Sequence, residues 1–201
     1  MPGNLLITSI NVQGIGDTNK RRDVLNCLKS KHSNIVCLQD THLTEKYLFF
    51  TRSIWGYECY FNNFSSQSRG VAIFINNNFD YSFQKMETDD QGNFIILHFL
   101  SYEKDITLFC IYGPNKDEPV FYESIKNKLS TIENDCIFVG DFNLVMSPQK
   151  DYFNYLHVNN PKSRDKVLEI VLEYNLIDCW REEHIEERKY TWFQKKSNKT
   201  R

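Results

Sequence analysis

The chain has 201 residues, of which 41% are hydrophobic and 14% aromatic, so it is long enough to bury the core of one domain. Its formal net charge of −2 excludes the overall basic character of a protein that binds nucleic acid tightly, but a local basic patch is still compatible with brief contact with DNA. No basic stretch with a following apolar run marks a signal peptide, and no segment approaches the ~20 apolar residues of a membrane span. We therefore expect no membrane contact and an intracellular protein of the nucleus or cytoplasm.

The cysteines indicate the same environment. None of the six belongs to a Cys-x-x-Cys pair, and at least three fall inside apolar runs, so buried reduced thiols are expected rather than disulfides or zinc ligands. Reduced thiols are typical of intracellular proteins. The six residues are Cys27, Cys37, Cys59, Cys110, Cys136 and Cys179.

Apolar runs and polar breaks predict the elements in chain order. Strands are expected over 5–12, 34–39, 57–62, 70–75, 80–87, 93–100, 105–112, 136–140 and 190–194. Helices are expected over 19–32, 44–54 with Thr44 as its cap, 118–132 and 163–174. Because the middle of the chain is a run of strands, the order suits an α/β sandwich of two packed sheets with helices outside, and not a strictly alternating fold. We expect a single domain over residues 1–201.

Four of these strands end at polar residues, which indicates a site at one rim of a sheet. The first delivers Asn11, the second delivers Asp40 with His42 nearby, and the strand over 105–112 delivers Tyr112. Each residue also has a structural alternative: a loop Asn, an Asp that opens a turn, a loop His and a core Tyr with its hydroxyl at the surface. The recurrence of such ends favours a functional site.

The strand over 136–140 is followed by Asp141 and Asn143. Side chains alternate along an extended chain, so these two are expected to point the same way while Phe142 turns to the core. A carboxylate beside a carboxamide can orient a water and hold an oxyanion, and hydrolysis of a phosphate ester needs both. The alternative is a turn pair that ends a strand.

Two basic features are candidates for contact with DNA. One is Arg69, which precedes Gly70; the other is the stretch 188–201, where six Lys and Arg residues alternate with aromatic residues and no acid is present. Basic groups neutralise phosphates and aromatic rings stack on bases. We therefore expect DNA to be bound weakly through a local patch, with a solvated chain end as the alternative for 188–201.

Six short motifs, in order, carry a family resemblance. They lie at residues 9–14, 37–43, 69–75, 111–115, 140–143 and 190–192. Together they resemble the endonuclease/exonuclease/phosphatase family, which includes DNase I and the abasic-site endonucleases, and most closely the endonuclease domain of non-LTR retrotransposons. The resemblance implies a four-layered α/β sandwich that cleaves phosphodiesters with Mg²⁺, or with Mn²⁺ in its place.

The resemblance also implies roles for individual residues. Asn11 and Asp40 fall at positions that hold the metal, Asp141 at the position that orients or deprotonates the attacking water, and Tyr112 and Asn143 at positions that bind the scissile phosphate. A further residue, Thr191, falls where the retrotransposon enzymes have a Thr that contacts the substrate.

The sequence departs from the family pattern at two places. Asp40 stands where the family has Glu, and since its side chain is shorter by one C–C bond, about 1.5 Å, we expect weakened metal binding. The sequence also stops at Arg201, before two strands that bring an Asp and an Asp-His pair in the family. We therefore expect a C-terminally truncated domain, missing its final strands, that nicks DNA poorly.

Three functions follow from the sequence. The first is a Mg²⁺-dependent DNA endonuclease of the retrotransposon type, with in-line attack of water. The second is an inactive remnant or a nucleic-acid-binding module, and the third is a phosphatase of the same fold acting on a small phosphoester.

Overall fold

The computed structural model describes residues 4–152, 160–191, 193–194 and 199–200. The chain forms two compact units: residues 1–113 with 132–142, and residues 114–131 with 143–201. A single domain over the whole chain stays a prediction.

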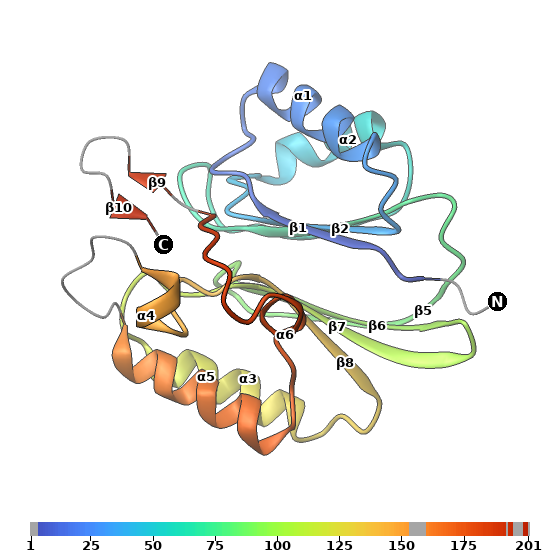
Figure 1. Cartoon of the computed structure of the whole chain (residues 1–201). Helices are drawn as coiled ribbons and strands as arrows, with labels where there is room; N and C mark the ends of the chain where they lie inside the picture. The colour runs from blue at the N-terminus through green and yellow to red at the C-terminus, as the bar shows by residue number, and fades with distance from the viewer. Residues whose placement is uncertain (1–3, 153–159, 192, 195–198, 201) are drawn as a thin grey trace. The chain divides into compact units, whose positions relative to one another are not determined.

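The first unit contains two four-stranded mixed sheets (Figure 1). One sheet has the order β1-β2-β4-β3, with β1 and β2 parallel and the other pairs antiparallel. Its strands are β1 (Ile7–Asn11), β2 (Ile35–Gln39), β3 (Cys59–Asn62) and β4 (Val71–Ile75). The other sheet has the order β5-β6-β7-β8, in which only β7 and β8 are parallel. Its strands are β5 (Ser82–Thr88), β6 (Phe94–Ser101), β7 (Lys104–Tyr112) and β8 (Asp135–Asp141).

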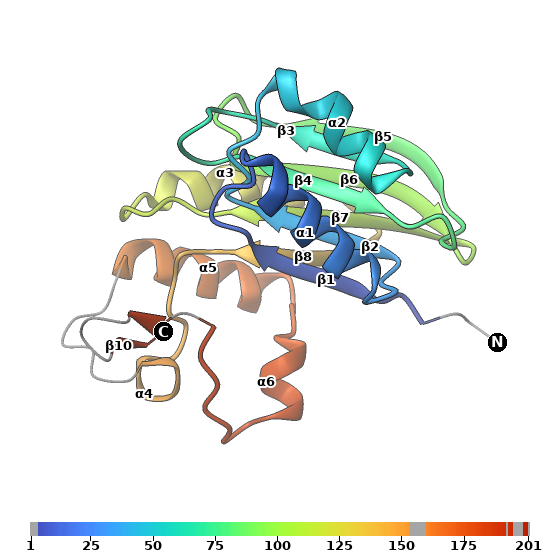
Figure 2. The same ribbon diagram turned by 90° about the horizontal axis from the view of Figure 1, so that it is seen from above.

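Strand β2 shows why this unit is layered. All five of its residues are buried. Ile35 and Cys37 face the core between the two sheets, whereas Val36 and Leu38 face the core beneath the helices. Because successive side chains point to opposite faces, a strand covered on both sides must be apolar throughout. The helices of this outer layer are α1 (Thr18–Lys29) and α2 (Glu45–Trp55), which lie over the β1-β2-β4-β3 sheet (Figure 2).

The ends of the two helices differ in their chemistry. Asp17 caps α1, since its carboxylate accepts a hydrogen bond from Lys20 N at 2.8 Å. The predicted cap of α2 is wrong in its mechanism: Thr44 occupies the N-cap position, but its side chain makes no capping hydrogen bond. At the other end, Gly56 (φ +84°) adopts the left-handed conformation that ends many helices, and its N–H donates to Arg52 O at 2.7 Å.

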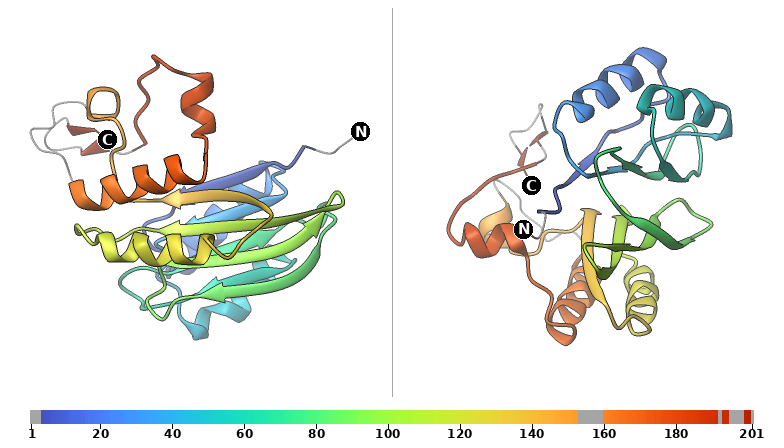
Figure 3. Two further views of the ribbon diagram at one scale, coloured as in Figure 1. Left: turned by 90° about the horizontal axis from the view of Figure 1, so that it is seen from below. Right: turned by 90° about the vertical axis from the view of Figure 1, so that its right-hand side faces the viewer.

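The second unit is built on a pair of helices, α3 (Pro119–Leu129) and α5 (Pro161–Glu173), which lie side by side (Figure 3). Lys126 forms ion pairs with Glu169 and Glu173, and Lys166 with Glu123. Its other elements are α4 (Pro148–Asp151), α6 (Cys179–Glu183), β9 (Phe193–Gln194) and β10 (Lys199–Thr200).

Two packed mixed sheets with helices confirm the predicted α/β class. Every predicted strand and helix is present, although the last strand is short: β9 begins at Phe193, and Trp192 lies outside the described residues. The six cysteines are free thiols, and those at positions 37, 59 and 110 are buried. Within the described part of the chain, the helices are too short or too polar to cross a bilayer.

Candidate active site

Strands β1 and β2 deliver two loops to one end of their sheet. Asn11 and Gln39 are paired in the last register position. Beyond the strands, Val12 N donates to Gln39 O at 3.0 Å and Gly14 N donates to Asp40 O at 2.7 Å. The parallel pairing therefore continues into the loops, and it carries Asn11 and Asp40 to the same end of the sheet.

A side-chain hydrogen bond joins the ends of the two sheets. Asn11 Nδ2 donates to Asp141 Oδ2 at 2.8 Å. Asn11 Oδ1 accepts from Gln13 N at 3.0 Å, which fixes the orientation of the amide. Asp141 ends β8, where it pairs with Tyr112, and its carbonyl accepts from Gly113 N at 2.8 Å. Three residues predicted from separate strand ends are thus brought together.

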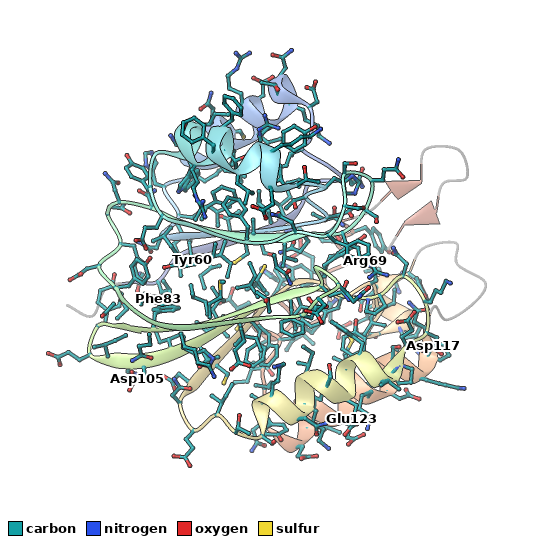
Figure 4. The ribbon with its side chains drawn as sticks, turned by 180° about the vertical axis from the view of Figure 1, so that it is seen from behind. Tyr60, Arg69, Phe83, Asp105, Asp117 and Glu123 are labelled. Carbon is teal, nitrogen blue, oxygen red and sulfur yellow. The ribbon has the colours of Figure 1, made fainter. Side chains whose placement is uncertain are left out.

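The Asp40 carboxylate is held by two donors, and the side chain of one of them, Arg69, is labelled in Figure 4. His42 Nε2 and Arg69 N lie 2.9 and 3.0 Å from Asp40 Oδ1. An ionised carboxylate only accepts, so the His42 ring donates through Nε2. The Asp40 and His42 side chains are 16% and 22% exposed, so both are anchored and still reach the surface. Spacing along the sequence gives no sign of this pairing.

Unusual backbone conformations produce this arrangement. Asp40, His42 and Arg69 have φ of +56°, +54° and +62°, which few non-glycine residues adopt. Gly14 (φ +76°) allows the loops to approach, because a Cβ there would lie 2.6 Å from His42 Nδ1. The carboxylate is therefore positioned by loop geometry as well as by its strand.

Gln39 is a further polar residue that the sequence places at the end of the second strand, without a predicted catalytic, metal-binding or substrate-binding role. Its side chain is 1% exposed, and its Nε2 donates to Ser9 Oγ at 3.1 Å and contacts Cys110 Sγ at 3.5 Å. The pKa of the nearby Cys37 thiol is raised well above its usual value. Burial is the main cause, and the neighbouring Cys110 is the second. The one available signal was a polar residue at the end of an otherwise apolar strand.

The surroundings of Tyr112, Asn143 and Thr191 differ from one another. Tyr112 is 7% exposed and belongs to the core between the sheets. Asn143 and Thr191 belong to the second unit. The extended chain expected between Asp141 and Asn143 is not found, because β8 ends at Asp141 and Asn143 adopts φ +51°. Asn143 is buried, and its carbonyl accepts from Asn160 Nδ2 at 3.1 Å. Thr191 is exposed and precedes β9 instead of lying in a strand.

Comparison with known proteins identifies the family and the fold. The sequence profile of the endonuclease/exonuclease/phosphatase family matches residues 8–168. The chain belongs to this family. Its members hydrolyse phosphate esters, so the chain belongs among nuclease- and phosphatase-type hydrolases.

Individual relatives of the family are distant in sequence and close in fold. A Xenopus laevis protein named transposon TX1 uncharacterized 149 kDa protein is 24% identical over 196 residues, which cover 94% of this chain and 14% of that protein. An AP endonuclease from Archaeoglobus fulgidus has 21% identity and a TM-score of 0.76, over 96% of this chain and 79% of its own. The Xenopus laevis APE2 catalytic domain has 18% identity and a TM-score of 0.75, over 95% and 76%. The structural matches show the fold.

The residues present fit a magnesium ion, the metal that the family resemblance implies. The described residues contain no cluster of three or more His, Cys, Asp and Glu side chains able to hold a metal. Mg²⁺ does not need one, since it is commonly bound by one or two carboxylates, waters and substrate phosphate oxygens. Asp40 supplies a hard oxygen donor, and its two donors, His42 and Arg69, both use Oδ1 and leave Oδ2 to other partners. This donor set suits Mg²⁺ or Mn²⁺ better than zinc.

Proposed function

We propose that the chain is a DNA endonuclease domain of the retrotransposon type that requires Mg²⁺, or Mn²⁺ in its place. The observation that carries the proposal is the hydrogen bond between Asn11 and Asp141 at the meeting ends of two sheets, with Asp40 on the adjacent loop. The name of the Xenopus relative as a transposon protein, and the names of the structural neighbours as AP endonucleases, support DNA as the substrate.

In this proposal Asp141 orients the attacking water and accepts its proton. The hydrogen bond from Asn11 fixes the carboxylate, and a fixed base is in place before the reaction begins. Asp40 and Asn11 would hold the metal, which supplies charge neutralisation at the phosphate. Tyr112 and Asn143 donate hydrogen bonds to the scissile phosphate.

Contacts away from the scissile phosphate involve Thr191 and Arg69. Thr191 is exposed, and the backbone N–H of Arg69 donates to the Asp40 carboxylate, so Arg69 is a neighbour of the proposed metal ligand. Both residues are assigned to contacts with the DNA substrate.

The proposal is tested by nicking of supercoiled plasmid with Mg²⁺, with Mn²⁺ and with EDTA. Asp141→Asn keeps the shape of the side chain but removes the base, and a loss of roughly 10²–10³-fold is expected. Asp23→Asn is the matched control, because Asp23 is a 74% exposed carboxylate on α1. Equal activity of the Asp141→Asn and Asp23→Asn variants would overturn the proposal. Hydrolysis of p-nitrophenyl phosphate without nicking would instead indicate the phosphatase, and binding without either reaction the inactive module.

The metal assignment has its own test. Calorimetric titration with Mg²⁺ should show nearly complete loss of binding in Asp40→Ala, whereas Asp40→Glu, which restores the reach found elsewhere in the family, should bind more tightly than the natural chain. An unchanged midpoint in both variants means that Asp40 only shapes its turn.

A further inference from the structure

Beside the candidate site, an arginine side chain is stacked on an exposed aromatic ring. The Arg69 guanidinium carbon lies 4.8 Å from the centroid of the Phe64 ring, and Arg69 Nη1 donates to Gln91 Oε1 at 2.9 Å. Phe64 is 44% exposed, which is a high value for a phenyl ring, and Gln91 is also exposed. These three residues, Phe64, Arg69 and Gln91, form what we call the platform.

The platform is tied directly to Asp40. Arg69 N donates to Asp40 Oδ1 at 3.0 Å, and Arg69 O accepts from His42 N at 2.9 Å. Arg69 does this in a left-handed conformation (φ +62°) that costs a non-glycine residue energy and that is concentrated at functional sites. The backbone of one residue therefore shapes the site while its side chain points to the flanking surface.

The charge of Arg69 is not neutralised by an acid within the described part of the chain. Its partners are a phenyl ring and a neutral amide, and none of the ion pairs among the described residues includes it. In a chain with net charge −2, a guanidinium without a carboxylate next to a candidate phosphoryl-transfer site is suited to a phosphate.

Hydrogen bonds in the loop that carries Gln91 hold the platform rigidly. The loop that carries Gln91 is fixed by Asn62, whose Nδ2 donates to Asp89 Oδ1 at 2.8 Å, while the same carboxylate oxygen accepts from Asn93 N at 2.8 Å. Gly92 (φ +67°) lets this loop approach, because a Cβ there would lie 2.8 Å from Phe64 Cβ. A preorganised ring loses little freedom when a ligand stacks on it.

We propose that the platform binds an unpaired nucleotide beside the scissile phosphate, so that the substrate is DNA that is single-stranded or locally unpaired at the cleavage site. The Arg69 guanidinium contacts a flanking phosphate, and the stack of Phe64 and Arg69 receives the base of that nucleotide. Bases of all four kinds stack on aromatic rings and guanidinium planes, so the platform selects for unpairing and not for sequence. This inference rests on the proposed function for the position of the scissile bond.

The test is DNA binding in EDTA, where hydrolysis does not interfere. Fluorescence anisotropy is measured with three labelled oligonucleotides: a single strand, a duplex with one unpaired nucleotide, and the fully paired duplex. Phe64→Leu should weaken binding of the first two by about five- to one-hundred-fold, the range that stacking of one base contributes, and that of the paired duplex by less than about twofold. Phe64→Tyr should retain binding, and the control Phe49→Leu removes a 73% exposed ring on α2 without effect.

Arg69→Gln should weaken binding of all three oligonucleotides and lower the slope of log affinity against log salt by about 0.7–0.9, the value for one phosphate contact. Arg22→Gln, at an exposed position of α1, is its control. Equal losses on paired and unpaired DNA in Phe64→Leu, or no loss at all, would overturn the inference. Selective loss in a chain that does not nick DNA would retain the platform and reject the proposed function. If the chain nicks DNA but Phe64→Leu leaves DNA binding unchanged, the proposed function is retained and the platform is rejected.

Discussion

Replacing Gly140 with Ala tests the strand that presents Asp141. Gly140 pairs with Ile111 in the β7–β8 ladder and has φ +145°. A Cβ at this position would lie 1.9 Å from Ile111 O and 2.8 Å from Ile111 C. Ordinary van der Waals contact begins at 3.4 Å, so the strands must separate by at least 1.5 Å, the difference between 3.4 and 1.9 Å.

The size of the effect follows from that displacement. Backbone hydrogen bonds need 2.7–3.2 Å between donor and acceptor, so a shift of this size breaks the ladder at this end of β8. Losing about two buried hydrogen bonds costs roughly 1–3 kcal/mol each, and the positive φ adds about 1–2 kcal/mol. A total of roughly 3–8 kcal/mol is a large part of the 5–15 kcal/mol that stabilises a typical domain.

Urea unfolding followed by circular dichroism measures this loss. Gly16→Ala is the control, since a Cβ at Gly16 would meet its nearest atoms at 3.8 and 3.9 Å. We expect the control to unfold within about 0.5 kcal/mol of the natural chain and Gly140→Ala to unfold at much lower urea. If the two variants behave alike, β8 does not pair with β7 in this register, and the placement of Asp141 beside Tyr112 at the end of that ladder is wrong.

Three other perturbations probe the packing and the charges. Trp55 is fully buried, and its indole Nε1 donates a hydrogen bond to the Ile75 backbone carbonyl at 2.7 Å. In thermal or urea unfolding, Trp55→Ala should lower the free energy of unfolding by about 3–5 kcal/mol and Trp55→Phe by about 1–3 kcal/mol. Equal losses in the two variants would refute the hydrogen bond. Burial raises the pKa of the Cys59 thiol to about 12. At pH 8, iodoacetamide should therefore modify the exposed Cys27 far faster than Cys59, and peptide mass spectrometry measures both rates. Equal rates would contradict the burial of Cys59. Hydrogen bonds from two lysines lower the pKa of Glu169 from 4.5 to about 2. Its carboxylate therefore contributes to folding stability above pH 4.5, and this contribution is lost as the pH falls towards 2. When stability is measured in an acid titration, the Glu169→Gln variant should lack this loss.

The sequence was sufficient to predict most of the fold because most strands are fully or half buried. The sequence predicts a strand over 105–112, and β7 is found at Lys104–Tyr112, since its apolar run is bounded by charges and by Gly113. The short helices α4 and α6 were missed because four or five residues do not complete enough turns to show a 3.6-residue period.

The candidate site was predictable only in part. The predicted strand ends place Asn11, Tyr112 and Asp141 together, as the structure does, because parallel pairing and the buried runs fix where each strand stops. The contact of His42 with Asp40 was not predictable, because it depends on left-handed conformations at residues other than glycine, which sequence patterns do not signal. Asn143 shows the converse: the pattern predicted extended chain up to this residue, but β8 ends at Asp141.

The left-handed residues are tolerated because the most buried strands support them. Strands β2 and β4 are paired up to Gln39 and Val71, and the ladder continues past their ends through Thr41 N to Gly70 O at 3.0 Å. Within this extension, Asp40 and Arg69 are linked by the hydrogen bond to Asp40 Oδ1. A local cost of about 1–3 kcal/mol per strained residue persists only where surrounding structure fixes it, and here two fully buried strands do so.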